Sequence, residues 1–272
     1  MSSRRSLWLL PLCLLLMGQD YNVPFRPRAA GGGDYCTGFQ FCNNFEITDP
    51  NCTPDEIGQA GEAGRATAVQ EDDAGELACD SAAAAVEGSA GLRIDGISTT
   101  FSTVAFAGVD NAVLDSADLH YLQFCHKEST TSSSAVVFDL VRFRSAGAAQ
   151  SASANGVLEI EADGTPQLRV SCNDGAPRSS AYVSLPTPTA WHALTVMFDE
   201  VVGANFQVKL WIDTDPSAVG ADATIDCFGA NPNADGHVLV WNTFTSGPHT
   251  AVVEFDKVRW KTGSAPGALT CP

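Results

Sequence analysis

From residue 100 onward the chain is a series of short segments rich in β-branched and aromatic residues. The segments are residues 100–106, 119–125, 135–144, 156–164, 165–172, 180–185, 191–199, 206–213, 237–244 and 251–260. In one of them Phe206 and Val208 alternate with Gln207 and Lys209, which is the two-residue period of a half-buried strand. Turn signals such as ADGTP and NDGAP separate the segments. With almost no amphipathic helix, the pattern predicts an all-β, antiparallel β-sandwich (jelly roll) of about a dozen strands.

The chain before these segments shows less periodicity. Residues 51–85 are rich in Ala, Gly, Asp and Glu, and we expect them to form surface loop. The extreme N-terminus has a basic start, MSSRR, followed by an apolar run too short to span a bilayer, as in a signal peptide. The predicted organisation is a signal peptide at 1–18 (cleaved between 18 and 31), a flexible leader at 19–34 and one domain at 35–272. The protein is therefore expected to be secreted or displayed at the cell surface, with no transmembrane segment.

The cysteines agree with an oxidising compartment. Cys13 falls in the predicted signal peptide, and the remaining cysteines are even in number, with no C-x-x-C pair suited to zinc or redox chemistry. We predict disulfide bonds among them, although the sequence leaves the pairing open and allows that some stay free. These cysteines are Cys36, Cys42, Cys52, Cys79, Cys125, Cys172, Cys227 and Cys271.

The chain is strongly acidic. Its net charge is −17, which repels nucleic acid and anionic membrane surfaces. The same charge disfavours polyanionic polysaccharides as ligands, unless a local basic patch is present.

Four stretches together resemble a known superfamily. They are NNFE at 43–46, GSAGLRIDG at 88–96, the Trp-led hairpin at 191–215 and VVEFDKVRW at 252–260. Their order resembles the concanavalin A-like lectin and glucanase jelly-roll domains over about residues 40–262. Galactose-binding-like jelly rolls share the FE pair and the Asp in the last strand, and they are the alternative topology. Because terminal strands are neighbours in jelly rolls, the resemblance implies that Cys271 clamps the C-terminal tail to the N-terminal cysteine region.

The resemblance allows a test for glycoside hydrolysis. Glucanases of this superfamily carry E-x-D-x-E or E-x-D-x-x-E on one strand, where alternate carboxylates serve as nucleophile and acid. Glu254 and Asp256 match the first two positions, but Val258 and Arg259 stand where the acid is needed. Strict alternation also places Val258 and Trp260 on the same face as the two carboxylates. That mixed face favours a framework role for this strand.

Polysaccharide lyases of the same fold use Tyr or His as a base, with Arg and Gln or Asn to neutralise a uronate carboxylate. Residues of these types are His120, Tyr121, Gln123 and His126, followed by Arg142 and Arg144. The R-x-E-x-R and Q-(I/V)-H strings of alginate lyases are absent. The alternative is that these residues are ordinary exposed strand surface.

Calcium is the metal that this composition favours, because it binds carboxylate and carbonyl oxygens. In the jelly rolls that the chain resembles, calcium often ties the FE segment to the final strand. The resemblance therefore implies Glu46 and Asp256 as ligands, with Asn44 as a third. The alternative is that these residues only cap and pair neighbouring strands.

Glycan binding needs aromatic rings on an exposed sheet face, where sugar C–H groups stack on them. Trp211 shares its predicted face with polar residues, and Trp241 and Tyr121 also have polar neighbours. We therefore predict a non-catalytic carbohydrate-binding or cell-surface adhesion and structural module, whose partner is a glycan or cell-surface polysaccharide. A polysaccharide-degrading enzyme, either glycoside hydrolase or lyase, is the alternative. The candidate ligand-binding residues are Tyr121, His126, Arg142, Arg144, Trp211 and Trp241.

Overall fold

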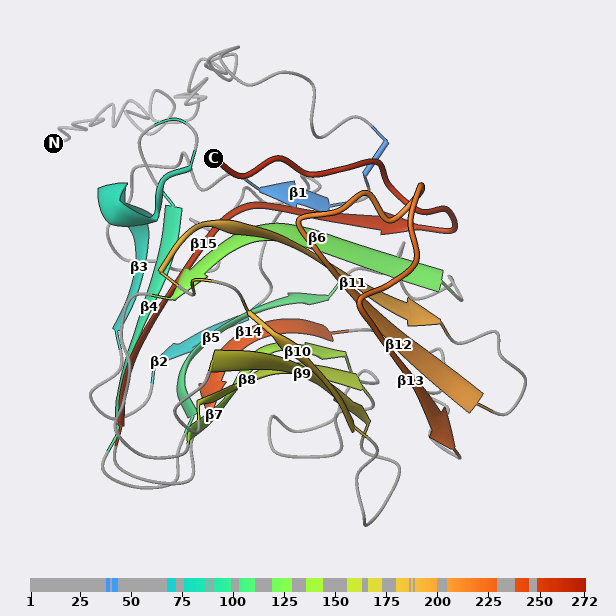
Figure 1. Cartoon of the computed structure of the whole chain (residues 1–272). Coiled ribbons are helices and arrows are strands. Elements are labelled where there is room, and N and C mark those ends of the chain that lie inside the picture. The colour runs from blue at the N-terminus through green and yellow to red at the C-terminus, as the bar shows by residue number, and fades with distance from the viewer. Residues whose placement is uncertain are drawn as a thin grey trace, which may run out of the picture. The chain divides into compact units, whose positions relative to one another are not determined.

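The computed structural model describes part of the compact unit Asp34–Pro272. The described residues are 38–39, 41–43, 68–71, 76–86, 88, 91–98, 103–110, 119–128, 136–143, 156–162, 166–172, 180–185, 187, 189–199, 205–228, 238–244 and 249–272. They form two antiparallel sheets and one 3-10 helix, η1 (Ala82–Ala84). The prediction of antiparallel strands is therefore confirmed (Figure 1). The predicted signal peptide and leader lie outside the described residues.

The first sheet has eight strands in the order β13-β12-β11-β6-β15-β4-β3, and β1 also pairs with β15. Their bounds are β1 Phe41–Asn43, β3 Glu76–Ser81, β4 Gly91–Ser98, β6 Leu119–Glu128, β11 His192–Asp199, β12 Asn205–Ile212, β13 Ala223–Phe228 and β15 His249–Thr262. On one edge of β15, β4 pairs with its first half and β1 pairs with its second half.

The second sheet has seven strands in the order β10-β9-β8-β7-β14-β5-β2. Their bounds are β2 Ala68–Glu71, β5 Thr103–Asp110, β7 Val136–Phe143, β8 Gly156–Ala162, β9 Pro166–Cys172, β10 Ser180–Ser184 and β14 Val238–Phe244. The expectation that residues 51–85 form only surface loop is wrong, because β2 and β3 add there to the edges of the two sheets.

The eight-stranded sheet has two different faces, and β6 lies at its centre. The inner face carries Phe124 from β6 and Phe255 from β15, whose rings lie 5.6 Å apart, with Trp260 beyond them. Strands β12 and β13 on this sheet lie against β9 of the other sheet, where Leu168 is fully buried. The apolar residues of the two sheets therefore meet between them. The opposite face of the eight-stranded sheet, on the side of Gln123 and Cys125, is called the outer face below.

One extra residue in β15 reverses its alternation. Asp256 lies opposite Cys125, but Arg259 lies opposite Gln123, and Lys257 has a left-handed φ of 51°. This is a β-bulge, in which two residues of one strand oppose one residue of the other. Asp256 and Arg259 are therefore both on the outer face, while Trp260 turns to the inner face. The expectation that Val258 and Trp260 share a face with Glu254 and Asp256 is corrected by this bulge.

The C-terminal residues 263–272 follow β15 and lie on the outer face; we call them the strap. Gly263 donates its backbone N–H to the Leu119 carbonyl of β6 at 2.9 Å, and the residues after it belong to no strand. Cys271 in the strap forms a disulfide with Cys125 at the centre of β6. The prediction that Cys271 joins the N-terminal cysteine region is wrong, because the strap turns back over the sheet to β6. Cys42 in β1 is also disulfide-bonded. Among the described residues no helix is long and apolar enough to cross a membrane.

Candidate functional site

A row of polar residues crosses four neighbouring strands of the seven-stranded sheet. Asp139 of β7 lies opposite Glu159 of β8, which lies opposite Arg169 of β9. Arg169 in turn lies opposite Tyr182 of β10. We call these four residues the polar row.

The burial of β9 shows which way its part of the polar row points. Leu168 and Val170, which flank Arg169 in sequence, are fully buried, and Arg169 is partly exposed. Since successive residues of a strand point to opposite faces, Arg169 lies on the face turned away from the eight-stranded sheet. This outward face is therefore open to solvent at β9 and β10.

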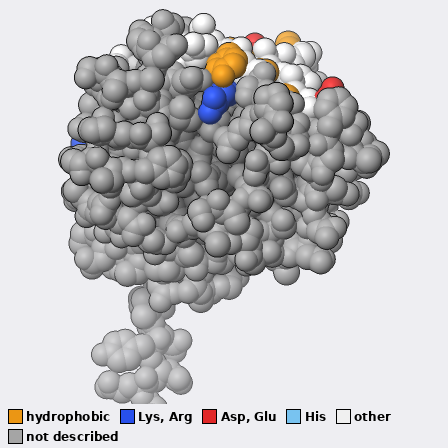
Figure 2. Space-filling view, turned by 90° about the horizontal axis from the view of Figure 1, so that it is seen from below, with side chains coloured by type: hydrophobic (Ala, Val, Ile, Leu, Met, Phe, Trp, Pro, Cys, Tyr) orange, Lys and Arg blue, Asp and Glu red, His pale blue; other side chains and the backbone are white. Residues whose placement is uncertain are grey.

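Tyr182 and Arg169 form the described end of the polar row. The Tyr182 side chain is 50% exposed, which makes it an unusually open aromatic residue. The Arg169 guanidinium lies 5.9 Å from the centre of the ring, and its Nη1 donates to the Tyr182 hydroxyl at 3.5 Å. Figure 2 views the molecule from the side of the seven-stranded sheet, where a hydrophobic and a basic side chain are both exposed. An open ring beside a fork of donors can stack on a sugar and donate to its hydroxyl groups.

Arg142, a predicted ligand-binding residue, lies on the same face as this row. Asp139 opposes Glu159, and Arg142 opposes Val157, with a register shift between Asp139 and Val141. Without that bulge, Asp139 and Arg142 would be placed on opposite faces, because they are three positions apart in the strand. The bulge thus brings a second arginine position to the outward face. Arg144 lies outside the described residues.

Trp241 occupies the other face of the same sheet. It follows Val240, which pairs with Arg142, and it lies opposite Ala107 of β5. By alternation, Arg142 and Trp241 lie on opposite faces, so the structure does not bring these two predicted residues together.

Tyr121 and Trp211 lie on the outer face of the eight-stranded sheet and are buried there. They form a cluster with Met197, and their exposed fractions are 7% and 5%. Trp211 donates its indole N–H to the Val219 carbonyl at 3.1 Å, so its polar end is satisfied internally. Burial is the larger cause that raises the pKa of Tyr121, and the charge of Asp199 is the second cause. The expectation that Trp211 is partly exposed is therefore wrong, because the turn after β12 covers the ring.

His126 lies on the inner face of β6 beside Phe255, with ring centres 5.5 Å apart. It is fully buried, and neither ring nitrogen has a hydrogen-bond partner. Burial is the larger cause that lowers the pKa of His126 to about 3, and the charge of His192 is the second cause. The His126 imidazole is therefore neutral and enclosed between the sheets, where a polymeric ligand cannot reach it in this structure.

Glu128 lies two residues further along the same face. It is 1% exposed, its carboxyl oxygens have no hydrogen-bond partner, and burial raises its pKa to about 7. Between pH 4.5 and 7 the folded chain keeps this proton and the unfolded chain releases it, so stability falls as pH rises. His126 has the opposite effect between pH 3 and 6.5, where only the unfolded chain is protonated, so stability falls as pH drops.

The Glu128→Gln variant tests the buried carboxyl group of Glu128. Relative to wild type, its free energy of unfolding should increase steadily between pH 4.5 and 7, by about 3 kcal/mol in total. Denaturant titrations of both proteins at each pH measure this difference, in which the other titrating groups cancel. A difference that does not change with pH would contradict the assignment.

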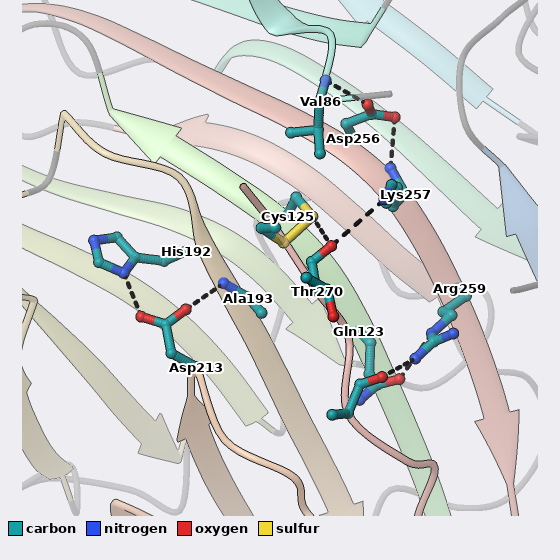
Figure 3. The surroundings of a disulfide bond; sticks show 12 residues. Val86, Gln123, Cys125, His192, Ala193, Asp213, Asp256, Lys257, Arg259 and Thr270 are labelled. Carbon is teal, nitrogen blue, oxygen red and sulfur yellow. Dashed lines mark hydrogen bonds and ion pairs between the residues drawn. A yellow bond between two sulfur atoms is a disulfide. The ribbon is translucent and has the colours of Figure 1, made fainter. Parts of the chain in front are cut away.

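Glu254 and Asp256, the paired carboxylates of the last strand, are both bound within the framework. Glu254 is 1% exposed and forms ion pairs with Arg93 at 3.6 Å and Lys127 at 2.5 Å. Asp256 accepts the backbone N–H groups of Val86 at 2.7 Å and Lys257 at 2.6 Å (Figure 3). These carboxylates hold together β4, β6, β15 and the segment after η1, which is the framework role that the sequence favours.

The calcium ligands proposed with Asp256 lie outside the described residues, namely Asn44 and Glu46. The register of β1 ends with Asn43 opposite Val258, two residues from Asp256. In the described part of the chain, no group of three acidic, histidine or cysteine side chains is placed to hold a metal ion.

The acidic turn after β12 uses its carboxylates in internal hydrogen bonds. Asp213 accepts the Ala193 N–H and bonds to the His192 ring, both at 2.7 Å. Asp215 accepts the hydroxyl and the N–H of Ser217, and these bonds lower its pKa. The turn is therefore explained by its own hydrogen bonding, as strand ends rich in Asp often are.

Sequence reasoning missed Tyr182 and Arg169. Both stand in short predicted strands, SAYVSL and TPQLRVSC, but neither matches a catalytic or binding motif. The available signal was a single aromatic residue among small and polar ones near the sheet edge. Only the register of β9 with β10 places the two side chains together.

Comparison with known proteins finds the fold but no family. The sequence matches no protein-family model and no curated protein. Among solved structures, the chain is similar to an endo-β-1,4-glucuronan lyase from the fungus Trichoderma reesei, with a TM-score of 0.53 and 12% identity. The match covers 83% of this chain and 96% of the lyase.

Two botulinum neurotoxin binding domains are similar to the same extent. The domain of type DC, in complex with SialylT, has a TM-score of 0.53 and 7% identity; that of serotype C1 has 0.51 and 9%. Each match covers 85% of this chain but only 50% of the toxin chain. At these identities the similarity shows a shared fold and nothing finer.

Proposed function

We propose that the protein binds glycans through the outward face of the seven-stranded sheet, at Tyr182 and Arg169. The observation that carries this proposal is a half-exposed aromatic ring beside a guanidinium, at the end of a row of polar positions. Rings and donors in this combination suit sugars, which present both C–H faces and hydroxyl groups. The carboxylate positions of the row and the net charge of −17 favour a glycan with few negative charges at this face.

The proposal includes the finer assignments of the fold. We infer that the two sheets form a jelly-roll sandwich of the concanavalin A-like type, and that the protein acts outside the cell as a secreted or surface module.

We also propose calcium bound by Asp256 with Glu46 and Asn44. A melting temperature that neither calcium nor a chelator changes would argue against that ion.

The Tyr182→Ala variant tests the binding face. Loss of the ring should weaken binding about tenfold or more, since stacking on an aromatic ring contributes on the order of 1–2 kcal/mol. A glycan array of plant, algal and bacterial polysaccharides, probed with the wild-type protein and the variant, measures this effect. Val219→Ala is the matched control, because Val219 is 49% exposed and lies in the turn after β12. Unchanged binding by Tyr182→Ala would contradict the proposed face.

A polysaccharide lyase is the second candidate. Two observations favour it: the fold match extends over almost the whole glucuronan lyase, and the Tyr182 hydroxyl contacts a guanidinium. In this reaction a base removes the proton next to the uronate carboxylate, the bond to the leaving oxygen breaks, and a C=C bond forms as that oxygen gains a proton. The variant Tyr182→Phe separates the two functions, because the ring stays and the hydroxyl is lost. Glycan binding should persist in this variant, whereas lyase activity should disappear.

A further inference from the structure

A histidine ties the chain that leaves β10 to the neighbouring sheet. His192, the first residue of β11, bonds through Nδ1 to the Asp213 carboxylate at 2.7 Å (Figure 3). Its Nε2 lies 3.2 Å from the Thr187 carbonyl oxygen. Thr187 follows β10 of the seven-stranded sheet, whereas Asp213 follows β12 of the eight-stranded sheet. One buried imidazole therefore joins the end of an edge strand in one sheet to a turn of the other.

Both partners of the His192 ring are acceptors. A carboxylate and a peptide carbonyl have no proton to donate, so each ring nitrogen completes its bond only when it carries a proton. An imidazolium has both protons, whereas a neutral imidazole has one. The Asp213 carboxylate keeps that one proton on Nδ1, which leaves the Nε2 lone pair facing the Thr187 carbonyl. Deprotonation of the ring therefore breaks the bond to Thr187 and keeps the bond to Asp213.

The other titratable groups around His192 do not bond to it in the described chain. His126 lies directly opposite on β6, and Glu128 lies two residues further on the same inner face. Lys127 lies on the outer face, over a tryptophan ring. Apolar side chains point inward from β12 beside His192 and from β9 and β10 in the other sheet, namely Ile212, Leu168, Val170 and Val183. The bond to Thr187 therefore depends on the proton of His192 and on the charge of Asp213.

Thr187 has a backbone conformation that other contacts must maintain. Its φ is 50°, in the left-handed region that a β-branched residue rarely adopts, and the next residue is Pro188, which restricts it further. Residues in such regions persist where the surrounding structure fixes them. The Thr187 carbonyl accepts the Ala190 N–H at 2.8 Å as well as the His192 bond. Loss of the His192 bond leaves this turn with half of that support.

The same segment fixes the strand that carries Tyr182. β10 is an edge strand of the seven-stranded sheet and pairs with β9 on one side. It ends at Ser184, and the chain is then anchored by the buried Leu185 and by Thr187. Strand ends that lose an anchor open locally, and Tyr182 lies only two residues before this end. Release of Thr187 should therefore reduce the time that the Tyr182 ring spends in its binding position.

We propose that His192 is a positioning residue of the glycan-binding face, whose imidazolium latches Thr187 and thereby keeps β10 and Tyr182 in place. The inference rests on the proposed function and adds its regulation by pH. Because only the protonated ring makes both bonds, the latch is closed at low pH and opens as the ring loses its proton. Binding of uncharged glycans should therefore become tighter as the pH falls.

Hydrogen exchange of the Ala190 amide, measured by NMR, tests the latch without any glycan. The wild type is compared at about pH 5.5 and about pH 8, on either side of the range in which imidazoles change charge. The protection factor, which is corrected for the intrinsic effect of pH on exchange, should be about fivefold lower at the higher pH. His192→Gln has no group that titrates at this position, so its protection factor should be the same at both pH values.

Asp213→Asn should reverse the sign of the pH dependence. Asn adopts the left-handed φ of 55° readily and keeps an oxygen for the Ala193 N–H. Its amide N–H would donate to Nδ1 of His192, so a neutral ring carries its proton on Nε2 and keeps the bond to Thr187. Protection of Ala190 should then be higher at about pH 8 than at about pH 5.5, an inversion that a merely structural role of the turn would not produce.

Two control variants should keep the wild-type dependence. Asp222→Asn is matched to Asp213→Asn, because Asp222 accepts the Ile212 N–H at 2.7 Å in the same turn without touching His192. Glu128→Gln removes the other nearby group that titrates in this range. Uncharged polysaccharides of the glycan array then report on binding, which should weaken about fivefold from about pH 5.5 to about pH 8 in the wild type and stay constant in His192→Gln.

Equal protection of Ala190 at both pH values in the wild type would overturn the latch, and so would a wild-type dependence in His192→Gln or Asp213→Asn. Binding that is constant with pH while the protection of Ala190 changes would overturn the effect on Tyr182. A wild type that binds no polysaccharide at either pH would contradict the proposed function, and the positioning role with it, whereas the exchange data would still decide whether the latch exists.

Discussion

Gly91→Ala is expected to lower the free energy of unfolding by about 3 kcal/mol. Gly91 begins β4 directly beneath η1, and an added Cβ would lie 2.5 Å from the Ala84 carbonyl carbon and closer still to its oxygen. Both atoms belong to the backbone, so the clash is relieved only if η1 moves away from the sheet. Denaturant titration followed by circular dichroism measures the loss.

Gly267→Ala is the matched control for this effect. Gly267 lies in the strap, and nothing would lie within 4 Å of a Cβ added there. Its stability should therefore stay within about 0.5 kcal/mol of wild type. Equal effects at Gly91 and Gly267 would contradict the close packing of η1 on β4.

Removal of the Cys125–Cys271 disulfide is expected to destabilise the fold by about 2–5 kcal/mol. The bridge joins residues separated by 146 positions, so it removes much conformational freedom from the unfolded chain. It also fixes Leu269 over the buried Cys125 and Ala193. Thermal unfolding of Cys125→Ala/Cys271→Ala against wild type measures this contribution.

The single variant Cys271→Ala is the control for the disulfide, since it loses the same bridge but keeps Cys125. Both variants should lose similar stability, and each should keep the far-ultraviolet spectrum of a β protein. A double variant as stable as wild type would show that the bridge does not hold the strap against the sheet.

The strands could be predicted from the sequence because each signal is local. Alternation in segments such as residues 206–213 reflects a strand with one buried face, and turn residues mark the ends. Strands β2 and β3 escaped prediction because they lie in stretches rich in Ala, Gly, Asp and Glu. Their place in the fold comes from pairing with β5 and β4 and not from their own composition.

The faces could not be predicted, because they depend on bulges and on distant segments. One extra residue at Lys257 turns Trp260 inward, and another irregularity in β7 turns Arg142 to the side of Asp139. Tyr121 has polar sequence neighbours, yet it is buried in a cluster with Trp211, against which Ala265 of the strap also packs. No local sequence pattern predicts that the strap, residues 263–272, covers β6 from the middle of the chain.

The framework role of Glu254 and Asp256 could be predicted from the sequence, because the third carboxylate of the glucanase motif is missing, and their internal partners in the structure agree with it. The candidate binding site could not be predicted, because Tyr182 and Arg169 belong to no motif. They become a site only through the register of β9 and β10, which no single segment specifies.

The most direct test of glycan binding without cleavage uses a polysaccharide that the array identifies, incubated with the wild-type protein. Its bound fraction and chain length are then measured together. The proposed function predicts that the wild type retains the polysaccharide at its original length, while Tyr182→Ala leaves it unbound. The account would be contradicted by a wild type that retains no polysaccharide, or by a polysaccharide that is bound and shortened with unsaturated ends.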